Sequence, residues 1–174
     1  MISVGGRYIP ESVYQKAEAG ESVYEKKFDA MKRPVDDYII QNAPTEEGWW
    51  YRTYRLDVSA FNSADQAYYY PIIGGYSGAK LSIYQDLIDY ALTKGPFGFN
   101  PAILNMLNVR YLVAPLGRLP LDGYVTAYQS GDRQVIENQN VLPKAWFVDE
   151  VQVVDSPRAA MDAITTASFD PRQT

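Results

Sequence analysis

The sequence predicts an α/β (α+β) fold, in which a mixed β-sheet of about five strands carries two to four packed helices. The first observation is that segments rich in aromatic and β-branched residues alternate with segments whose apolar residues recur at helical spacing. The second is composition: 47% of the 174 residues are hydrophobic and 14% are aromatic, which suffices for one domain with a sizeable core. The third is the absence of internal repeats and low-complexity tracts.

We expect two parts: an N-terminal arm over residues 1–47, loosely ordered or packed on the domain, and an α/β domain over residues 48–174. The arm mixes charges with isolated aromatic residues, and its apolar residues are too sparse for a core strand. Within it, Pro34 can open a short helix at the first position, with Val35 and Ile39 on one face.

The domain opens with a predicted strand over residues 49–61, rich in aromatic and β-branched residues. A long connection with three consecutive tyrosines at 68–70 follows, and such connections in compact domains are often functional. The main helix is predicted from apolar residues at helical spacing: Leu81, Tyr84, Ile88 and Ala91. Ser77 is its expected N-cap, and Gly95 followed by Pro96 is expected to end it.

Local signals mark the next elements. Asn100 is the expected cap of a short helix that has Pro101 at its first position. A strand that ends at Pro115 follows this helix. Residues 123–138 indicate a hairpin that turns around Gly131.

The end of the chain is predicted as a further strand and a last helix. "KAWFVDEVQVVDS", residues 144–156, has the composition of a strand. The helix over residues 157–169 has Ser156 as its cap and Pro157 in its first turn. No apolar stretch approaches the roughly 18 residues that a membrane-spanning helix needs.

Composition excludes several classes of function. The net charge of −5 argues against a nucleic-acid partner and against adhesion to an anionic lipid surface. The chain has no cysteine and no histidine, which excludes disulfides, cysteine-based zinc sites and any Ser–His–Asp triad. Catalysis would therefore depend on carboxylates, tyrosine, lysine or arginine, and we expect no cofactor and no metal.

The glycine pair Gly74–Gly75 precedes the main helix and allows two interpretations. With Lys80 as a counter-charge, it could hold a phosphate near a helix N-terminus. No GxxxxGK[ST] or GxGxxG pattern is present, so a nucleotide site is not predicted. A turn that leads the chain into a helix is the commoner use of such glycines.

Paired carboxylates are the remaining route to catalysis, because glycosidase chemistry needs two acids roughly 5 to 10 Å apart. The candidates are Asp57, Asp65, Asp86, Asp89, Glu137, Asp149 and Glu150. Asp86 and Asp89 share the solvated face of one helix, and neighbours on a strand point in opposite directions. No pair stands out.

Three ordered blocks carry a family resemblance: "YRLDVSAFNSADQAYYYPIIGGYSGAKLSIYQDLID", "AILNMLNVRYLV" and "VIENQNVLPKAWFVDEVQVVDSPRAAMDAI…FDP". From about residue 49 to the end, the chain resembles the C-terminal extracytoplasmic region of the YfhO family. These are bacterial polytopic membrane proteins related to the GT-C glycosyltransferases. Family members carry many transmembrane helices before this region and usually continue beyond "FDP" into a β-rich segment. The resemblance therefore implies an excised domain.

The resemblance implies a non-catalytic extracytoplasmic domain of a cell-membrane protein involved in cell-envelope glycosylation with lipid-linked sugars. In GT-C enzymes the catalytic acid typically lies in a loop between early membrane helices, so no active-site residue is carried over here. The implied partners are the transmembrane portion of the parent chain and a lipid-linked sugar or glycan acceptor, with no nucleic acid.

For ligand contact, the sequence favours Tyr76, Lys80 and Tyr84, together with Tyr69 and Asn62 from the same block. Tyr84 lies on the apolar stripe of the helix, so a core position is its plain interpretation. Two alternatives stay open. One is a protein-interaction module of the cell envelope that docks partners through an exposed tyrosine face and handles no sugar. The other, less favoured, is a carboxylate-based enzyme of glycosidase type.

Overall fold

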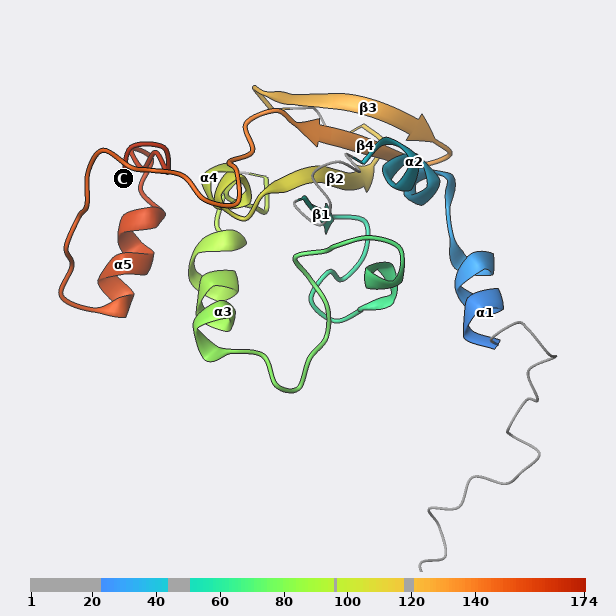
Figure 1. The fold of residues 1–174 in the computed structure, drawn as a ribbon, viewed down its shortest axis with the longest axis horizontal. Helices are drawn as coiled ribbons and strands as arrows, with labels where there is room; N and C mark the ends of the chain where they lie inside the picture. The colour runs from blue at the N-terminus through green and yellow to red at the C-terminus, as the bar shows by residue number, and fades with distance from the viewer. Residues whose placement is uncertain (1–22, 44–50, 96, 118–120) are drawn as a thin grey trace, which may run out of the picture. The chain divides into compact units, whose positions relative to one another are not determined.

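The computed structural model describes residues 23–43, 51–95, 97–117 and 121–174, and the chain divides into two compact units, residues 1–33 and 34–174 (Figure 1). The first unit contains helix α1 (Val23–Met31). Just beyond the helix, the backbone N–H of Lys32 donates to the carbonyl of Phe28 at 3.0 Å. All other elements belong to the second unit. Helix α2, which lies in the segment expected as an arm, is one of them.

The second unit is built on a mixed four-stranded sheet, in the order β1-β2-β4-β3 (Figure 1). Its strands are β1 (Arg52–Arg55), β2 (Val109–Pro115), β3 (Tyr124–Ser130) and β4 (Arg133–Asn138). β1 runs parallel to β2, and the other pairs are antiparallel. Gly131, with φ of 58°, makes the turn of the predicted β3–β4 hairpin. The expected α/β (α+β) class with a mixed sheet is confirmed.

Helices cover both faces of this sheet. On one face, α2 (Pro34–Asn42) inserts Val35 and Ile39 into an apolar cluster with β2 and β4. On the other face, α3 (Ser82–Leu87), the π-helical turn η3 (Ile88–Leu92) and α4 (Pro101–Met106) form the larger cluster. α5 (Pro157–Ile164) lies beside them, with Met161 and Ile164 packed against the larger cluster.

Two register shifts decide which side chain meets which helix. Arg52 pairs with Val109 but the next residue, Thr53, pairs with Tyr111. The skipped residue sends Val109 into the larger cluster and Tyr111 into the α2 cluster. A second shift in β3 turns Tyr128 toward α2, where its ring stacks on Tyr38 at 4.8 Å.

Most of the predicted helix caps are confirmed. The Asn100 side chain accepts from the N–H of Ala102 at 3.0 Å, and the Ser156 hydroxyl accepts from the N–H of Ala159 at 3.1 Å. The prediction for Ser77 is wrong, because its hydroxyl accepts the N–H of Ala79 in a local turn. The N-cap of α3 is Leu81, with no capping hydrogen bond from its side chain. Pro96, the expected stop, lies outside the described residues.

The predicted strand over residues 144–156 is not a strand. It runs as an irregular connection between β4 and α5 (Figure 1). Strand propensity needs a neighbour with free backbone groups, and none pairs with this segment in the described part of the chain. Among the described residues, no helix has both the length and the apolar character to cross a membrane.

Candidate functional site

The glycine pair brings two loops into close contact. The N–H of Gly75 donates to the carbonyl of Ala60 at 2.7 Å, and a Cβ at Gly74 would lie 2.0 Å from the same oxygen. Gly75 also has a φ of 110°, which side chains rarely adopt. Because α3 begins only at Ser82 and Gly75 already has a backbone partner, the pair does not form a phosphate loop at a helix N-terminus. Its role is a close-packed turn.

Three of the five predicted ligand residues gather around this turn. The ammonium of Lys80 lies 5.6 Å from the centre of the Phe61 ring and donates to Gln85 Oε1 at 3.2 Å. Asn62, the neighbour of Phe61, is exposed and donates to the Ser59 hydroxyl at 2.9 Å. Tyr76 follows the glycine pair and is 72% exposed. We call Phe61, Asn62, Tyr76 and Lys80 the Lys80 surface.

Tyr84 lies beneath this surface rather than on it. Its half-buried hydroxyl donates to the carbonyl of Ile73, which holds the glycine turn against α3. Burial raises the pKa of Tyr84. The ring packs against the larger core cluster, as the apolar stripe of the helix indicated.

Tyr69 belongs to the opposite side of the sheet. It packs partly buried against the α2 cluster, with its ring centre 6.0 Å from that of Tyr68 and 6.3 Å from that of Tyr70. Of the three consecutive tyrosines, Tyr68 is exposed and Tyr70 is buried. The structure therefore does not bring Tyr69 to the Lys80 surface, and the run forms no continuous exposed apolar face.

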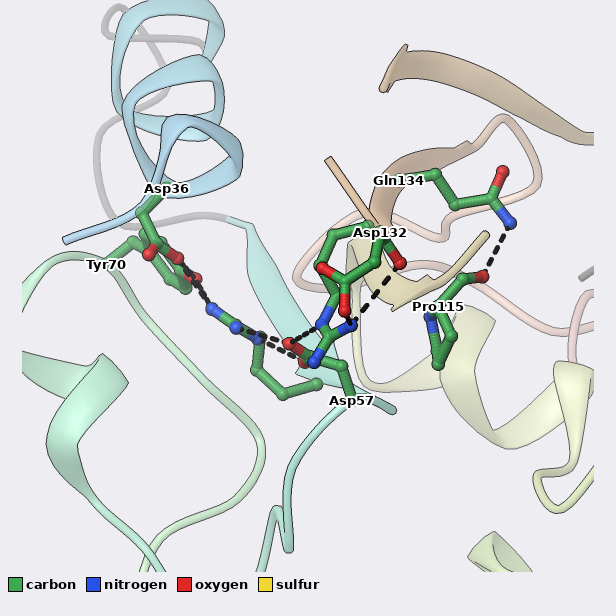
Figure 2. A network of polar contacts seen from close by, with 8 residues as sticks. Asp36, Asp57, Tyr70, Pro115, Asp132 and Gln134 are labelled. Carbon is green, nitrogen blue, oxygen red and sulfur yellow. Dashed lines mark hydrogen bonds and ion pairs between the residues drawn. The ribbon is translucent and has the colours of Figure 1, made fainter. Parts of the chain in front are cut away.

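A buried ionic network joins α2, β1 and β4 (Figure 2). Arg55 makes two hydrogen bonds of 2.7 Å to the carboxylate of Asp57 and one of 2.6 Å to Asp36. Arg133 donates to the same Asp57 at 3.0 Å. The Tyr70 hydroxyl accepts from Arg55 at 2.8 Å and donates to Asp36 at 2.5 Å. These five residues are the Arg55 network.

The charges of the Arg55 network balance, with two arginines and two aspartates, and the pKa values of Arg55, Asp57 and Tyr70 are shifted. Burial disfavours the charged form of Arg55, but its hydrogen bonds to Asp57 and the nearby negative charges outweigh this effect and raise the pKa of the guanidinium. Burial also acts to raise the pKa of Asp57, yet its bonds to Arg55 and Arg133 lower it. Burial raises the pKa of Tyr70. Since each group has a partner, the network is suited to holding elements together and not to proton transfer.

The sequence did not identify this network. Its contacts join residues up to 76 positions apart, and Asp36 lies in the segment expected as an arm. The available signal was the pattern Arg55-Leu56-Asp57 at the end of an aromatic strand, where two opposite charges flank an apolar residue.

The seven candidate carboxylates do not assemble a catalytic pair. Asp57 belongs to the Arg55 network, and three others have side-chain partners: Asp65 bonds to Ser63, Asp89 to Gln85, and Glu137 to Arg110 on the adjacent strand. Five of the seven are exposed at the surface: Asp65, Asp86, Asp89, Asp149 and Glu150. Among the described residues, no three acids lie close enough together to hold a metal ion.

Two acids that the sequence did not single out share a polar pocket of about 370 Å³. Asp122 and Asp170 line it together with Asn105, Asn140 and Arg172. Asp170 accepts from the backbone N–H of Arg172 at 3.0 Å, a contact typical of a turn. The pocket offers carboxylate, amide and guanidinium groups to a hydroxylated ligand. Both acids follow or precede turn residues, a pattern too common in sequences to be a signal.

Asn105, which lines this pocket, connects two blocks of the sequence. The Asn138 amide donates to Asn105 Oδ1 at 2.8 Å and to the carbonyl of Val109 at 3.0 Å. The N–H of Leu142 donates to the carbonyl of Asn105 at 3.0 Å. The segments "AILNMLN" and "VIENQNVL" therefore fold directly onto each other.

Comparisons with family models, with curated proteins and with solved structures found no match to this chain.

Proposed function

We propose that the chain is the non-catalytic extracytoplasmic domain of a YfhO-like bacterial membrane protein involved in cell-envelope glycosylation with lipid-linked sugars. In this proposal the domain positions a lipid-linked sugar or an acceptor, or braces the membrane-embedded part of its parent chain. The three ordered blocks of the sequence are the starting point.

The observation that carries the proposal is where the three blocks lie in the fold and what they contact. Gly74 and Gly75 close the first block onto Ala60, and Asn138 ties the third block to Asn105 of the second. The residues of the resemblance thus build and brace the domain, and among the described residues they assemble no catalytic pair. A positioning or bracing role agrees with this distribution.

The Lys80 surface is the part of the first block that remains available to a ligand. It combines a cation over an aromatic ring, an exposed amide at Asn62 and an exposed phenol at Tyr76. A cation suits a phosphate, an aromatic face suits a sugar ring, and an amide suits hydroxyl groups. We therefore place contact with the phosphate of a lipid-linked sugar at this surface.

The first test asks whether the chain belongs to a larger membrane protein, by reading the coding sequence on both sides of this segment. Hydrophobic spans of about 20 residues upstream of residue 1 are expected. A parent gene without such spans would overturn the assignment to a membrane protein.

Ligand contact is tested in the intact parent protein, reconstituted in lipid nanodiscs and titrated with a short-chain prenyl-phosphate-linked hexose. Lys80→Gln is expected to weaken binding about tenfold, which corresponds to about 1.4 kcal/mol for one charge-assisted contact. Lys94→Gln removes an exposed lysine just beyond η3 and is expected to leave binding unchanged. Equal effects of the two substitutions would remove the Lys80 surface from the proposal.

The shared pocket of Asp122 and Asp170 favours one second candidate, a carboxylate enzyme of glycosidase type. Its test is hydrolysis of nitrophenyl glycosides by this chain, with Asp122→Asn and Asp170→Asn as paired variants. Activity that both variants abolish would support this candidate. Absence of hydrolysis would dismiss it.

A further inference from the structure

Residues 146–154, here called the edge segment, show an alternation of exposed and held side chains. Phe147 is fully exposed, and Val151 and Val153 are 82% and 90% exposed. An apolar pocket of about 280 Å³ is lined by residues of α5 together with Val148, Glu150, Gln152 and Val154, and the exposed Val151 also borders it. Apart from Val151, the pocket-lining positions recur at every second residue, which is the period of a β-strand with one face toward the pocket and the other open.

The side of the edge segment that faces the pocket is fixed to the domain. The indole N–H of Trp146 donates to the carbonyl of Pro171 at 2.7 Å. The N–H groups of Asp149 and Glu150 both donate to the carbonyl of Gln173, at 3.2 and 2.9 Å. Residues 146–150 of the edge segment are therefore held against residues 171–173, beyond the end of α5.

The backbone of residues 151–154 has no hydrogen-bond partner among the described residues. Three of these four residues are valine, which favours strands. Proteins usually cover or interrupt an exposed apolar strand with free backbone groups, because it pairs readily with another chain. An apolar surface that is left open in this way marks an interaction site.

We propose that the edge segment docks a partner protein by β-augmentation, in which an extended strand of the partner pairs with residues 151–154. Valine side chains of alternate partner positions would cover Val151 and Val153. This inference goes beyond the proposed function and depends neither on the Lys80 surface nor on a membrane-bound parent.

Charge identifies the chemistry of the partner strand. Exposed acids flank the valines on both sides: Asp149 and Glu150 before them and Asp155 after them. If two copies of the chain paired antiparallel about Gln152, Asp149 of each copy would face Asp155 of the other, and like charges directly opposite are destabilising. A strand with an apolar centre and lysine or arginine at both ends avoids this repulsion and gains attraction instead. The partner is therefore a basic-flanked extended strand of another protein.

The test uses two synthetic peptides with the same centre of alternating valine and threonine, one flanked by lysines and one by glutamates. Amide hydrogen exchange of the full chain is followed with each peptide. The lysine-flanked peptide is expected to slow exchange at residues 151–154, and the glutamate-flanked peptide is expected to have no effect. Similar protection by both peptides, or no protection at 151–154, would overturn the proposal.

Variants test whether the peptide binds at the edge segment or at β3, the outermost strand of the sheet. Val151→Lys with Val153→Lys is expected to lower affinity for the lysine-flanked peptide at least tenfold. Val125→Lys changes an exposed valine on β3 and is expected to leave affinity unchanged. Protection that falls on β3 overturns the proposal. So does concentration-dependent self-association that the double variant removes, since the second copy would then be the occupant.

Discussion

The Arg55 network and the edge segment treat their side chains in opposite ways. The network places charged groups inside, with the side chains of Asp36, Arg55 and Asp57 at most 3% exposed, and each has a partner. The edge segment places Phe147, Val151 and Val153 outside, with no strand beside them among the described residues. The Arg55 network thus contains the residue types of an active site, but its hydrogen bonds and ion pairs serve to hold α2, β1 and β4 together. The proposed docking site lies instead in the edge segment, where apolar side chains are exposed.

The largest expected effect comes from disrupting the Arg55 network. Arg55→Met leaves Asp36 and Asp57 buried without their main counter-charge, and we expect a loss of about 3–5 kcal/mol in the free energy of unfolding. Urea unfolding followed by circular dichroism measures it. Arg110→Met breaks the half-exposed pair with Glu137 and should cost about 0–1 kcal/mol. Equal losses in the two variants would show that the Arg55 network contributes no more than a surface ion pair.

Low pH is expected to weaken the same Arg55 network. Because the folded state lowers the pKa of Asp57, the folded protein keeps this group ionised where the unfolded chain binds a proton. The stability that Asp57 contributes is therefore complete above its unfolded pKa of about 3.9 and is lost as pH falls through the lower folded value. The chain has no histidine, so urea midpoints should be nearly constant between about pH 5.5 and 7.5 and fall below about pH 4.5. A midpoint that rises on acidification would contradict this assignment.

The glycine turn supports a smaller prediction with a matched control. Gly74→Ala places a methyl group 2.0 Å from the Ala60 carbonyl, so the two loops must separate. We expect a loss of about 1–3 kcal/mol and weaker ligand contact at the Lys80 surface. Gly78→Ala meets open space at an ordinary φ and should change stability by less than about 0.5 kcal/mol. Thermal unfolding of both variants measures the difference.

Local signals predicted much of this fold. Asn100 and Ser156 cap their helices because each contact depends on a neighbour two or three residues away. Gly131 turns its hairpin for a similarly local reason. The Lys80 surface was partly predicted, since Tyr76 and Lys80 follow the glycine turn in sequence.

Features that depend on distant contacts were missed. The Arg55 network needs Asp36 and Arg133, which the topology of the sheet brings to β1. Tyr69 was grouped with the ligand residues because it lies in the same block of sequence, but in the structure it packs against the α2 cluster, on the other face of the sheet. Residues 144–156 have strand composition, yet a strand also needs a partner, and composition does not provide one.

The smallest expected effect comes from the two exposed valines of the edge segment, compared with one buried valine under the same substitution. Val151→Thr with Val153→Thr changes side chains that already face solvent, so the free energy of unfolding should shift by less than about 0.5 kcal/mol. Val113→Thr places a hydroxyl in the fully buried α2 cluster and should cost about 1–3 kcal/mol. Guanidinium unfolding of both variants measures the contrast. A loss at 151 and 153 that matched the loss at 113 would mean that the edge segment is already covered within the folded chain. A shift near zero, together with loss of peptide protection at 151–154, would assign those valines to a partner and not to the stability of the domain.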